Sequence, residues 1–360
     1  MQEYTYMDLH VAGEPFRLVT GGLPEIIGET MAQKRTYAIE HMDGIRKVVL
    51  LEPRGHADMY GGFLTPPVHP DSDFGIVFIY GSGMSTMCGH GVIAAARAAV
   101  ELGFVSLPDN GATVSTVPVR IDAPSGTANL FIHTAEGKIQ SIAFQNSLSF
   151  PYALNQQIVT PTYGQVMVDI GYGGAFMVFA DIRQFGMSLD SGNISAMLAI
   201  AMECGEVAIS QLHMVHPLHP ERNAESDGIC MILVEDASAA EENEEENGKE
   251  ETSNVTPEEV YTKTFTVFGQ SQFDRSPTGT GTSALAAILW KKGALQPGQA
   301  LVNTGISGIP FRVTMEVQGE HIIPTIYSNA YVTGKGSVIL EEDDPLPEGL
   351  FFKDAGSKEI

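Results

Sequence analysis

An internal repeat limits the folds that this chain can adopt. The first copy has a short apolar run at residues 75–80, a Gly/Ser-rich turn, and then CGHGVIAAARAAVELG at residues 88–103. The second copy has an apolar run at residues 265–268, a polar loop, and TGTGTSALAAILWKKG at residues 278–293. Alanine-rich interiors favour helix, and a glycine directly after the last turn commonly ends one. The pattern therefore predicts a strand, a loop and a helix in each half of the chain.

Both predicted helices are apolar on nearly every side, which is typical of a helix in a protein interior. We therefore expect an α/β (α+β) protein with two pseudo-symmetric lobes, each with a curved sheet around a central helix. The first lobe should comprise residues 1–165 and 330–360, and the second residues 166–329. Further helices are expected at residues 28–41 and 193–204, and further strands at residues 47–51 and 165–170.

Composition narrows the class of protein. The chain has 360 residues, of which 43% are hydrophobic and 18% charged, as in a globular protein. Its 44 acidic and 20 basic residues give a net charge of −24, which disfavours binding to nucleic acid or to an anionic membrane. A cytoplasmic protein is expected, because the only cysteines are the widely spaced Cys88, Cys204 and Cys230 and no signal peptide is visible. Residues 194–202, the most apolar stretch, are interpreted as a buried helix.

One segment departs from globular composition. Residues 241–251 read EENEEENGKEE, with seven glutamates, one lysine and no apolar residue. Such a run buries too little surface to offset the entropy of ordering it. We expect a disordered acidic insertion at about residues 236–256, between two strands; a partner-binding tail is the alternative.

Two glycine motifs begin the repeated helices. Residues 89–94 and 279–284 both fit G-x-G-x-x-A, the relaxed dinucleotide-binding pattern. That pattern needs an acidic residue about 20 positions later to hold the ribose. No Asp or Glu occurs between Arg275 and Met315, so nucleotide binding is disfavoured. A helix N-terminus also binds carboxylates, and two of them could hold one small carboxylate ligand.

Cys88 is the candidate reactive group. A free thiol has a pKa of about 8.5, which a helix N-terminus lowers by stabilising the thiolate. Such a thiolate can abstract a proton or act as a nucleophile near neutral pH. Cys204 and Cys230 lie in apolar stretches and are interpreted as inert buried thiols.

Several motifs together resemble the proline racemase superfamily. The two signature motifs are MCGHG at residues 87–91 and DRSPTGTGTS at residues 274–283. Other similar stretches are DLHVAGEPFRLVTGG at residues 8–22, GGAFMVFAD at 173–181, the pair His216-Pro217, and AYVTG at 330–334. The resemblance covers nearly the whole chain and implies the diaminopimelate-epimerase-like fold, which agrees with the repeat.

The resemblance also implies a reaction that needs no cofactor. Racemases and epimerases of this family use two cysteines, one on each face of the substrate's α-carbon. The first matches Cys88, but the position of the second is Thr278. A threonine hydroxyl does not titrate near neutral pH, so two-base racemisation should fail. The Cys/Thr pair resembles the trans-3-hydroxy-L-proline dehydratase branch, which forms pyrroline-2-carboxylate.

The resemblance implies roles for the remaining site residues. Asp274 should meet the ring nitrogen of the substrate; capping a helix or pairing with Arg275 are the alternatives. His90 is either a substrate contact or a structural histidine. Thr278 either bonds the substrate or caps its helix. The full set of predicted site residues is Cys88 and Thr278 as catalytic residues, with Gly89, His90, Gly91, His216, Asp274, Gly279 and Thr280 binding substrate.

The prediction is therefore a cofactor-independent, metal-free hydro-lyase that acts on a small imino acid. One alternative is a proline or hydroxyproline racemase or epimerase of the same fold. A second is a non-catalytic imino-acid-binding protein, and a nicotinamide-dependent oxidoreductase is the outside option. The resemblance also implies a homodimer.

Overall fold

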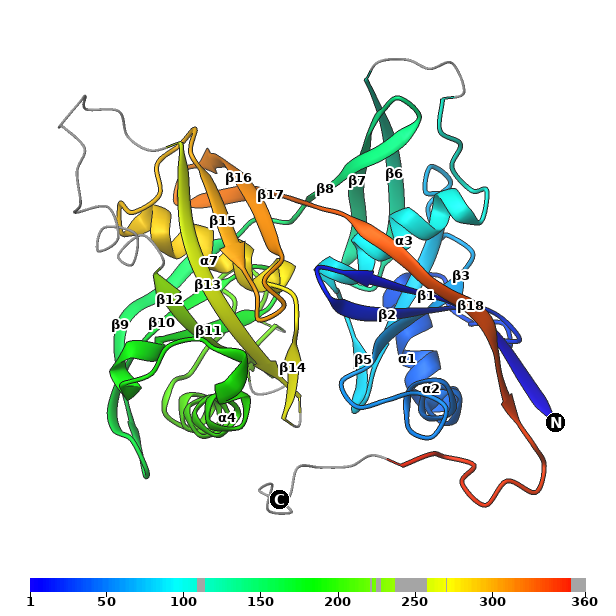
Figure 1. The fold of residues 1–360 in the computed structure, drawn as a ribbon, viewed down its shortest axis with the longest axis horizontal. Helices are drawn as coiled ribbons and strands as arrows, with labels where there is room; N and C mark the ends of the chain where they lie inside the picture. The colour runs from blue at the N-terminus through cyan, green and yellow to red at the C-terminus, as the bar shows by residue number, and fades with distance from the viewer. Residues whose placement is uncertain (109–113, 221, 225–227, 237–257, 270, 351–360) are drawn as a thin grey trace. The chain divides into compact units, whose positions relative to one another are not determined.

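The computed structural model describes residues 1–108, 114–220, 222–224, 228–236, 258–269 and 271–350 (Figure 1). The predicted acidic insertion thus lies almost wholly outside the described residues. The chain divides into two compact units: unit 1 is Met1–Gln145 with Tyr327–Ile360, and unit 2 is Asn146–Ile326. These boundaries differ from those of the expected lobes, because residues 150–160 form a strand that pairs within unit 2.

Unit 1 is built on one sheet whose neighbouring strands are mostly antiparallel. The pairing runs β18–β1–β2–β3–β4–β6–β7–β8, with β2–β3 and β4–β6 parallel and β5 added to β4. The strands are β1 (Gln2–Val11), β2 (Glu14–Gly21), β3 (Tyr60–Thr65), β4 (Phe74–Tyr80), β5 (Gly83–Ser85), β6 (Ser115–Ala123), β7 (Gly126–Ala135), β8 (Lys138–Gln145) and β18 (Ala330–Leu340).

Three helices accompany this sheet. Helix α3 (Gly89–Glu101) contacts β1, β2, β3, β6, β7, β8 and β18, so the sheet surrounds it (Figure 1). Helices α1 (Met31–His41) and α2 (Asp43–Leu50) bury apolar side chains in one cluster with Val77 and Ile79 of β4. The interior of α3 is alanine, which lets the strands approach the helix closely.

Unit 2 repeats this design with its own sheet. The pairing runs β9–β10–β11–β12–β13–β15–β16, with β14 added to β13. The elements are β9 (Phe150–Thr160), β10 (Gly164–Tyr172), β11 (Phe176–Asp181), η1 (Ile182–Phe185), η2 (Ser191–Asn193), α4 (Ile194–Gln211), β12 (Cys230–Asp236), β13 (Glu259–Phe268), β14 (Gln272–Asp274), α7 (Gly279–Lys291), β15 (Ala300–Thr304), β16 (Pro310–Gln318) and β17 (His321–Ser328).

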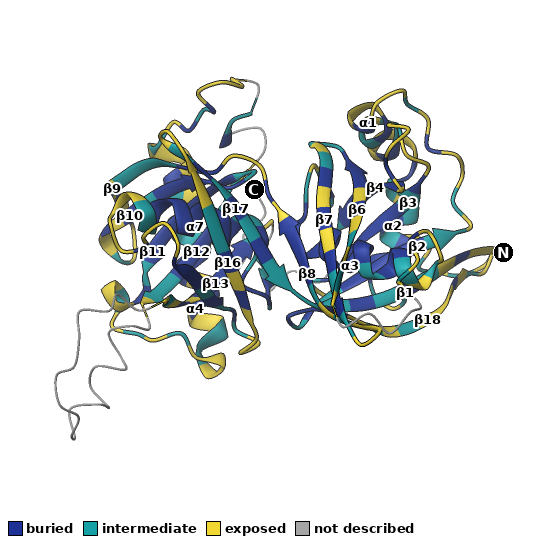
Figure 2. Cartoon of the chain, turned by 90° about the horizontal axis from the view of Figure 1, so that it is seen from above, coloured by how far each residue is buried: buried dark blue, intermediate teal, exposed yellow. Residues whose placement is uncertain are grey.

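Helix α7 is the counterpart of α3. It contacts β9, β10 and β16, and most of its residues are buried, as Figure 2 shows for both helices. Gly103 and Gly293, with φ of +76° and +78°, follow the two helices and confirm the predicted helix ends. The sequence therefore located both central helices and their ends correctly.

Helix α4 packs on β9, β12 and β13 and buries Met197, Ile200, Ala201 and Cys204. It confirms the helix predicted from residue 193 and continues to Gln211. Among the described residues, the stretch Ser191–Gln211 alone is long and apolar enough to cross a membrane by length and composition. In the structure it is a core-facing helix of unit 2, as interpreted from residues 194–202.

One predicted element is wrong. Residues 47–51 were expected to form a strand because Val48 and Val49 are β-branched. Residues 47–50 lie instead in α2, where Asp43 stands in the first turn and bonds the Arg46 guanidinium at 2.7 Å. Arg46 also donates to the carbonyl oxygens of Tyr80 and Gly81, which fastens this helix to the end of β4. Tertiary contacts therefore override the local strand preference.

Asp122 of β6 is a buried structural anion. Its carboxylate accepts bonds from the backbone N–H groups of Val68 and His69, from the Ser72 and Thr127 hydroxyls, and lies 2.9 Å from His69 Nδ1. Burial alone would raise the pKa of Asp122, but the bonds from His69, Ser72 and Thr127 outweigh it and lower the pKa from 3.8 to about 2. This carboxylate therefore ties the segment after β3 to the sheet.

We expect Asp122→Asn to reduce the free energy of unfolding at pH 7 by about 2 kcal/mol or more. Because the folded pKa is depressed, the stabilisation is present above the unfolded pKa and is lost as pH falls from about 4 through about 2. Urea unfolding of both proteins between pH 7 and pH 3 tests this. If the free energies of unfolding of the two proteins differed by the same amount at every pH, the prediction would be contradicted.

Candidate active site

Cys88 stands at the N-terminus of α3, as predicted. It is the residue that precedes the helix, with extended backbone, and its Sγ accepts the Gly91 backbone N–H at 3.3 Å. His90 lies against the same sulfur, with Nδ1 at 3.3 Å and Nε2 at 3.6 Å. The thiol is 6% exposed and the imidazole 4% exposed. The sulfur therefore accepts one backbone N–H, lies beside an imidazole and stands at the positive end of a helix dipole.

Aromatic side chains hold His90 in this place. Its ring meets Phe16 and Tyr60 edge to face, with centroid distances of 6.0 and 5.1 Å. The Tyr60 hydroxyl in turn bonds the Ser85 hydroxyl at 2.5 Å, on the strand just before Cys88. His90 is thus buried against Cys88, and both of its predicted roles, the structural one and the substrate contact, stay predictions.

Position 91 requires glycine because neighbouring side chains lie very close to its backbone. A Cβ built at this position would lie 2.8 Å from both the Phe16 and Phe78 rings and 3.0 Å from Cys88 Sγ. A side chain here would displace the sulfur or the aromatic wall. The G-x-G pattern after Cys88 therefore has a packing reason that does not involve a nucleotide.

In unit 2, Thr278 and Asp274 contact each other directly. The Thr278 hydroxyl donates to Asp274 Oδ2 at 2.7 Å, and the Ser276 N–H donates to Asp274 Oδ1 at 2.7 Å. Thr278 occupies the position before α7, but its side chain makes no capping bond to that helix. The capping alternative for Thr278 is therefore wrong.

The backbone of Thr278 is strained. Its φ of +61° lies in the left-handed region, which a β-branched residue rarely adopts. Such a conformation persists only when its surroundings enforce it. Gly305 packs so closely on the preceding loop that an added Cβ would lie 2.5 Å from the Ser276 carbonyl carbon. Gly305 therefore lies close against the loop that leads to Thr278, with no room for a side chain between them.

Asn303 of β15 supports the same loop from inside unit 2. Its side chain is completely buried and its Nδ2 donates to the Thr282 hydroxyl at 2.9 Å and toward the Pro277 carbonyl at 3.5 Å. Thr282 itself donates to the Pro277 carbonyl at 2.9 Å. The buried amide therefore joins β15, the first turn of α7 and the residue directly before Thr278. The sequence offered no signal for this role, because Asn303 is remote along the chain.

The N-terminal ends of both central helices offer backbone donors. The first helical bonds are Val92 N–H to Cys88 O and Thr282 N–H to Thr278 O. The N–H groups of the residues that begin each helix precede these bonds, and that of Gly91 is taken by Cys88 Sγ. The residues whose N–H groups were predicted to bind the carboxylate, Gly89, His90, Gly279 and Thr280, are thus placed as expected at a helix start, and their substrate contacts stay predictions.

His216 lies in an aromatic group of unit 2. Its ring meets Tyr172 and Phe150 edge to face at 4.6 and 5.3 Å, and its Nδ1 accepts the N–H groups of Leu218 and His219. These contacts organise the turn after α4. A substrate contact for His216 stays a prediction.

The other two cysteines have weakly acidic thiols. Burial raises the pKa of Cys204 to about 12, with a smaller contribution from Glu203. Burial also raises the pKa of Cys230 to about 12, and there the second cause is the negative charge of Asp274. Both values agree with the predicted inert thiols. The proximity of Cys230 to Asp274 was missed, because it depends on the pairing of β12 with β13 and of β13 with β14.

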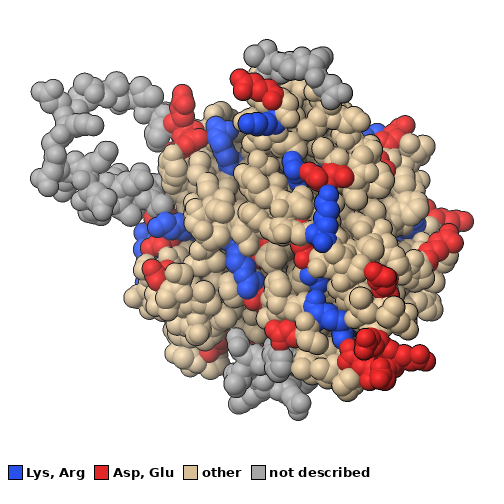
Figure 3. All heavy atoms as spheres, turned by 45° about the vertical axis from the view of Figure 1, so that its right-hand side comes forward, with Lys and Arg blue, Asp and Glu red and all other residues tan. Residues whose placement is uncertain are grey.

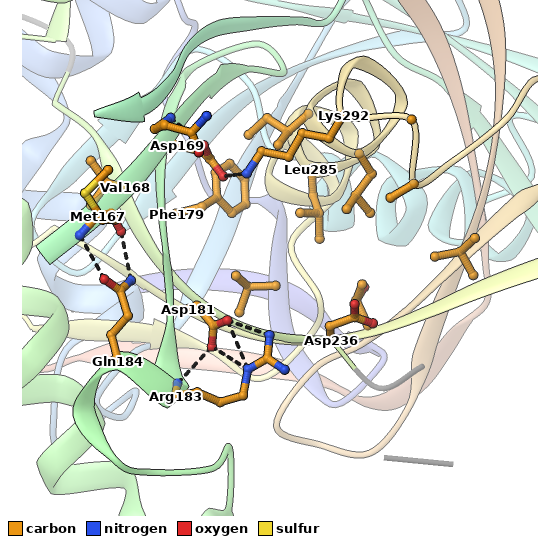
Figure 4. Close-up of a pocket in the computed structure, with 18 of the residues that line it drawn as sticks. Met167, Val168, Asp169, Phe179, Asp181, Arg183, Gln184, Asp236, Leu285 and Lys292 are labelled. Atoms are coloured by element: carbon orange, nitrogen blue, oxygen red, sulfur yellow. Dashed lines mark hydrogen bonds and ion pairs between the residues drawn. The ribbon is translucent and has the colours of Figure 1, made fainter. Parts of the chain in front are cut away.

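Unit 2 also contains a cavity of about 840 Å³ beside the C-terminal half of α7 (Figure 4). None of the predicted site residues lines it.

Across the described parts of the chain, no group of three or more His, Cys, Asp or Glu side chains could hold a metal ion. On the face drawn in Figure 3, basic and acidic side chains are interspersed.

The chain belongs to the proline racemase family, whose model matches residues 6–351. It is 34% identical over 354 residues to trans-3-hydroxy-L-proline dehydratase of Bacillus cereus, covering 97% of this chain and 98% of that one. It is 36% identical over 352 residues to 3-hydroxyproline 2-epimerase of Burkholderia multivorans, covering 96% and 97%. The structure of a probable proline racemase from Agrobacterium radiobacter, 25% identical, superposes with a TM-score of 0.81 over 97% of this chain and 96% of that one.

These similarities confirm the predicted family and fold. Both central helices, their preceding residues and the surrounding sheets are therefore those of a proline racemase family enzyme. The relatives carry three different activities in their names, so the family alone does not choose among dehydration, epimerisation and racemisation.

Proposed function

We propose that this protein dehydrates trans-3-hydroxy-L-proline to pyrroline-2-carboxylate without a cofactor. The observation that carries the proposal is the bond from Thr278 to Asp274. Thr278 stands where a racemase of this family has its second cysteine, and its one hydroxyl proton is directed to Asp274. The Thr278 hydroxyl does not ionise near neutral pH, and it already donates its proton to Asp274. It is therefore poorly suited to act as the second acid of a racemase. The similarity to trans-3-hydroxy-L-proline dehydratase supports the same reaction.

In this mechanism Cys88 is the only acid–base group. The 3-hydroxyl of trans-3-hydroxy-L-proline lies on the same ring face as the α-hydrogen. The thiolate takes the α-proton, the electrons of the Cα–H bond form a Cα–Cβ double bond, and the Cβ–O bond breaks. The thiol returns that proton to the leaving hydroxyl, which departs as water. The cyclic enamine then tautomerises to pyrroline-2-carboxylate.

The helix starts and Asp274 supply the electrostatics. Negative charge develops on the substrate carboxylate as the α-carbon loses its proton, and the backbone N–H groups of Gly89, His90, Gly279 and Thr280 stabilise it. Asp274, 3% exposed, provides an anion for the ring ammonium. A retained ammonium also makes the α-hydrogen more acidic.

Thr278 acts in this proposal as a positioning residue for Asp274. We expect Thr278→Val to raise KM about tenfold, because a hydrogen bond to a charged group is lost. Thr278→Ser keeps the hydroxyl and should stay within about threefold of the parent enzyme. Steady-state kinetics of both variants checks this. A large loss of kcat in Thr278→Val with unchanged KM would instead mean that Thr278 acts on the reacting carbon.

The reaction itself is tested by proton NMR in D₂O. We expect trans-3-hydroxy-L-proline to disappear as pyrroline carboxylate forms, while L-proline in a parallel tube keeps its α-hydrogen. Deuterium entering proline with inversion would establish a racemase. Inversion of 3-hydroxyproline at Cα would establish an epimerase. Binding of either compound without any exchange would leave a non-catalytic imino-acid-binding protein.

We also propose a cytoplasmic homodimer, as the family resemblance implies. The chain has a mass of 38.6 kDa, so light scattering after size exclusion should give about twice that value.

A further inference from the structure

A buried polar network connects the sheet of unit 2 with the loop that carries Asp274 and Thr278. Its centre is the Asn303 side chain on β15, which is 0% exposed. The Thr262 hydroxyl donates to Asn303 Oδ1 at 3.0 Å, and the Thr264 hydroxyl lies 2.9 Å from Nδ2 and 3.2 Å from Oδ1. Both threonines belong to β13, the parallel neighbour of β15 (Figure 1). One side of the amide is thus anchored in the sheet.

The amide nitrogen continues the network toward Pro277. Asn303 Nδ2 donates to the Thr282 hydroxyl at 2.9 Å, and that hydroxyl donates to the Pro277 carbonyl at 2.9 Å. A second, longer contact of 3.5 Å joins Nδ2 to the same carbonyl. Thr282 is also 0% exposed, and hydrogen bonds that are shielded from water are stronger than those at a surface. The Pro277 carbonyl is therefore held from inside unit 2.

Thr282 holds both peptide planes that flank Thr278. Its hydroxyl donates to the Pro277 carbonyl, in the plane before Thr278, and its backbone N–H donates to the Thr278 carbonyl at 2.8 Å, in the plane after. Because peptide units are planar, fixing these two planes fixes φ and ψ of the residue between them. Rotating Thr278 out of its left-handed φ of +61° moves one of the planes and so disturbs a bond of Thr282.

The backbone of Thr278 in turn directs its side chain. With this backbone, the Thr278 hydroxyl donates to Asp274 Oδ2 at 2.7 Å. Ser276 contributes two further bonds, since its N–H donates to Asp274 Oδ1 at 2.7 Å and its hydroxyl accepts the Thr278 N–H at 3.1 Å. A continuous series of hydrogen bonds therefore leads from β13 through Asn303 and Thr282 to the Asp274 carboxylate.

We propose that Asn303 and Thr282 are positioning residues for the recognition of the substrate's ring ammonium. Their bonds hold the backbone of Thr278 so that its hydroxyl keeps the Asp274 carboxylate in the orientation that meets the ammonium. This inference rests on the proposed function, in which Asp274 binds the ring nitrogen. It adds two buried residues on which that binding depends, neither of which contacts the substrate.

The test compares two ligands that differ at the ring nitrogen. Proline carries a ring ammonium and a carboxylate, whereas cyclopentanecarboxylate has a ring of the same size and the carboxylate without the nitrogen. Dissociation constants are measured by ligand-observed NMR for the full-length parent and for Thr282→Val, which keeps the side-chain shape and removes the hydroxyl. We expect proline binding to weaken about fivefold and cyclopentanecarboxylate binding to change less than about twofold. A general loss of structure would weaken both ligands equally.

Three further variants define the residues involved. Thr282→Ser keeps the hydroxyl and should keep the parent's ratio of the two dissociation constants. The matched control is Thr262→Val, which removes a buried hydroxyl from the opposite side of the same amide. It should lower the free energy of unfolding and leave the ratio unchanged. Asn303→Ala should shift the ratio at least as far as Thr282→Val; if Asn303→Ala does not fold, Thr282→Val decides the inference.

A crystal structure of Thr282→Val gives a readout that needs no ligand. We expect φ of Thr278 to leave the left-handed region and its bond to Asp274 to lengthen. An unchanged Thr278 in that structure, an unchanged ratio in Thr282→Val, or an equal shift of the ratio in Thr262→Val would each overturn the inference. A parent protein that binds both ligands equally, or neither, would refute the proposed role of Asp274 and this inference with it. The two failures are distinguishable, because the second is seen in the parent before any variant is made.

Discussion

Cys88→Ser should lower kcat for trans-3-hydroxy-L-proline by about a thousandfold or more, with little change in KM. The serine keeps the shape of the residue before α3 and can accept the Gly91 N–H, so the local structure should survive. Its hydroxyl is not ionised near neutral pH, so the group proposed to take the α-proton is lost. Loss of the substrate signals in NMR measures the rate.

The control for this variant is Cys204→Ser. Cys204 is buried in the core of unit 2, and the raised pKa of its thiol makes it unreactive near neutral pH. We expect this variant to lose stability but to keep its turnover per folded molecule. If Cys88→Ser retained more than about a tenth of the parent rate, another group would have to be the base, and the single-thiol mechanism would fail.

Asp274→Asn should raise KM by about a hundredfold, the second large effect expected. The carboxylate is almost completely buried and is held by the Thr278 hydroxyl and the Ser276 N–H. Removing one partner of a buried charge pair costs roughly 2–5 kcal/mol, which corresponds to a factor of at least about thirty. The amide cannot balance the ring ammonium of the substrate and should also disturb the Thr278 bond.

The comparison of kcat with KM decides what Asp274 does. If its role is to hold the ring ammonium, KM rises more than kcat falls, and proline, which carries the same ammonium, loses affinity equally as an inhibitor. A fall in kcat alone, with unchanged inhibition by proline, would assign Asp274 to the chemical step. A matched control is Asp73→Asn, since Asp73 is an exposed carboxylate of unit 1 whose Oδ2 accepts the backbone N–H of Arg120.

Local sequence predicted the two central helices because alanine content and the glycines before and after each helix all favour the same structure. The same reasoning failed at residues 47–51, where two valines suggested a strand. There the decisive interactions are those of Arg46 with Asp43 and with carbonyl oxygens at residues 80 and 81, and the last two are remote in sequence. Helix α2 therefore depends on contacts that no local pattern contains.

The candidate site divides in the same way. Cys88, Asp274 and Thr278 were found from motifs, because each stands at a fixed distance from a helix start. The bond between Thr278 and Asp274 depends on a left-handed backbone at Thr278, which sequence rules assign to glycine or asparagine. Strand pairing and packing place Asn303 and Cys230 near the loop that carries Asp274 and Thr278. Their contributions could be recognised only in three dimensions.

In the proposed mechanism, the bond from Thr278 to Asp274 also links reaction type to substrate affinity. A cysteine at position 278 would gain a titrating thiol for the second face of the substrate, but a thiol donates only a weak hydrogen bond. The same substitution, which replaces the hydroxyl by a thiol and removes the methyl group, would therefore loosen Asp274 while it supplies the second thiol that the proposed mechanism lacks. A lineage that moves between dehydration and epimerisation through this single codon should pass through an enzyme that binds its imino acid less tightly, unless a second substitution near Asn303 or Gly305 restores the position of Asp274.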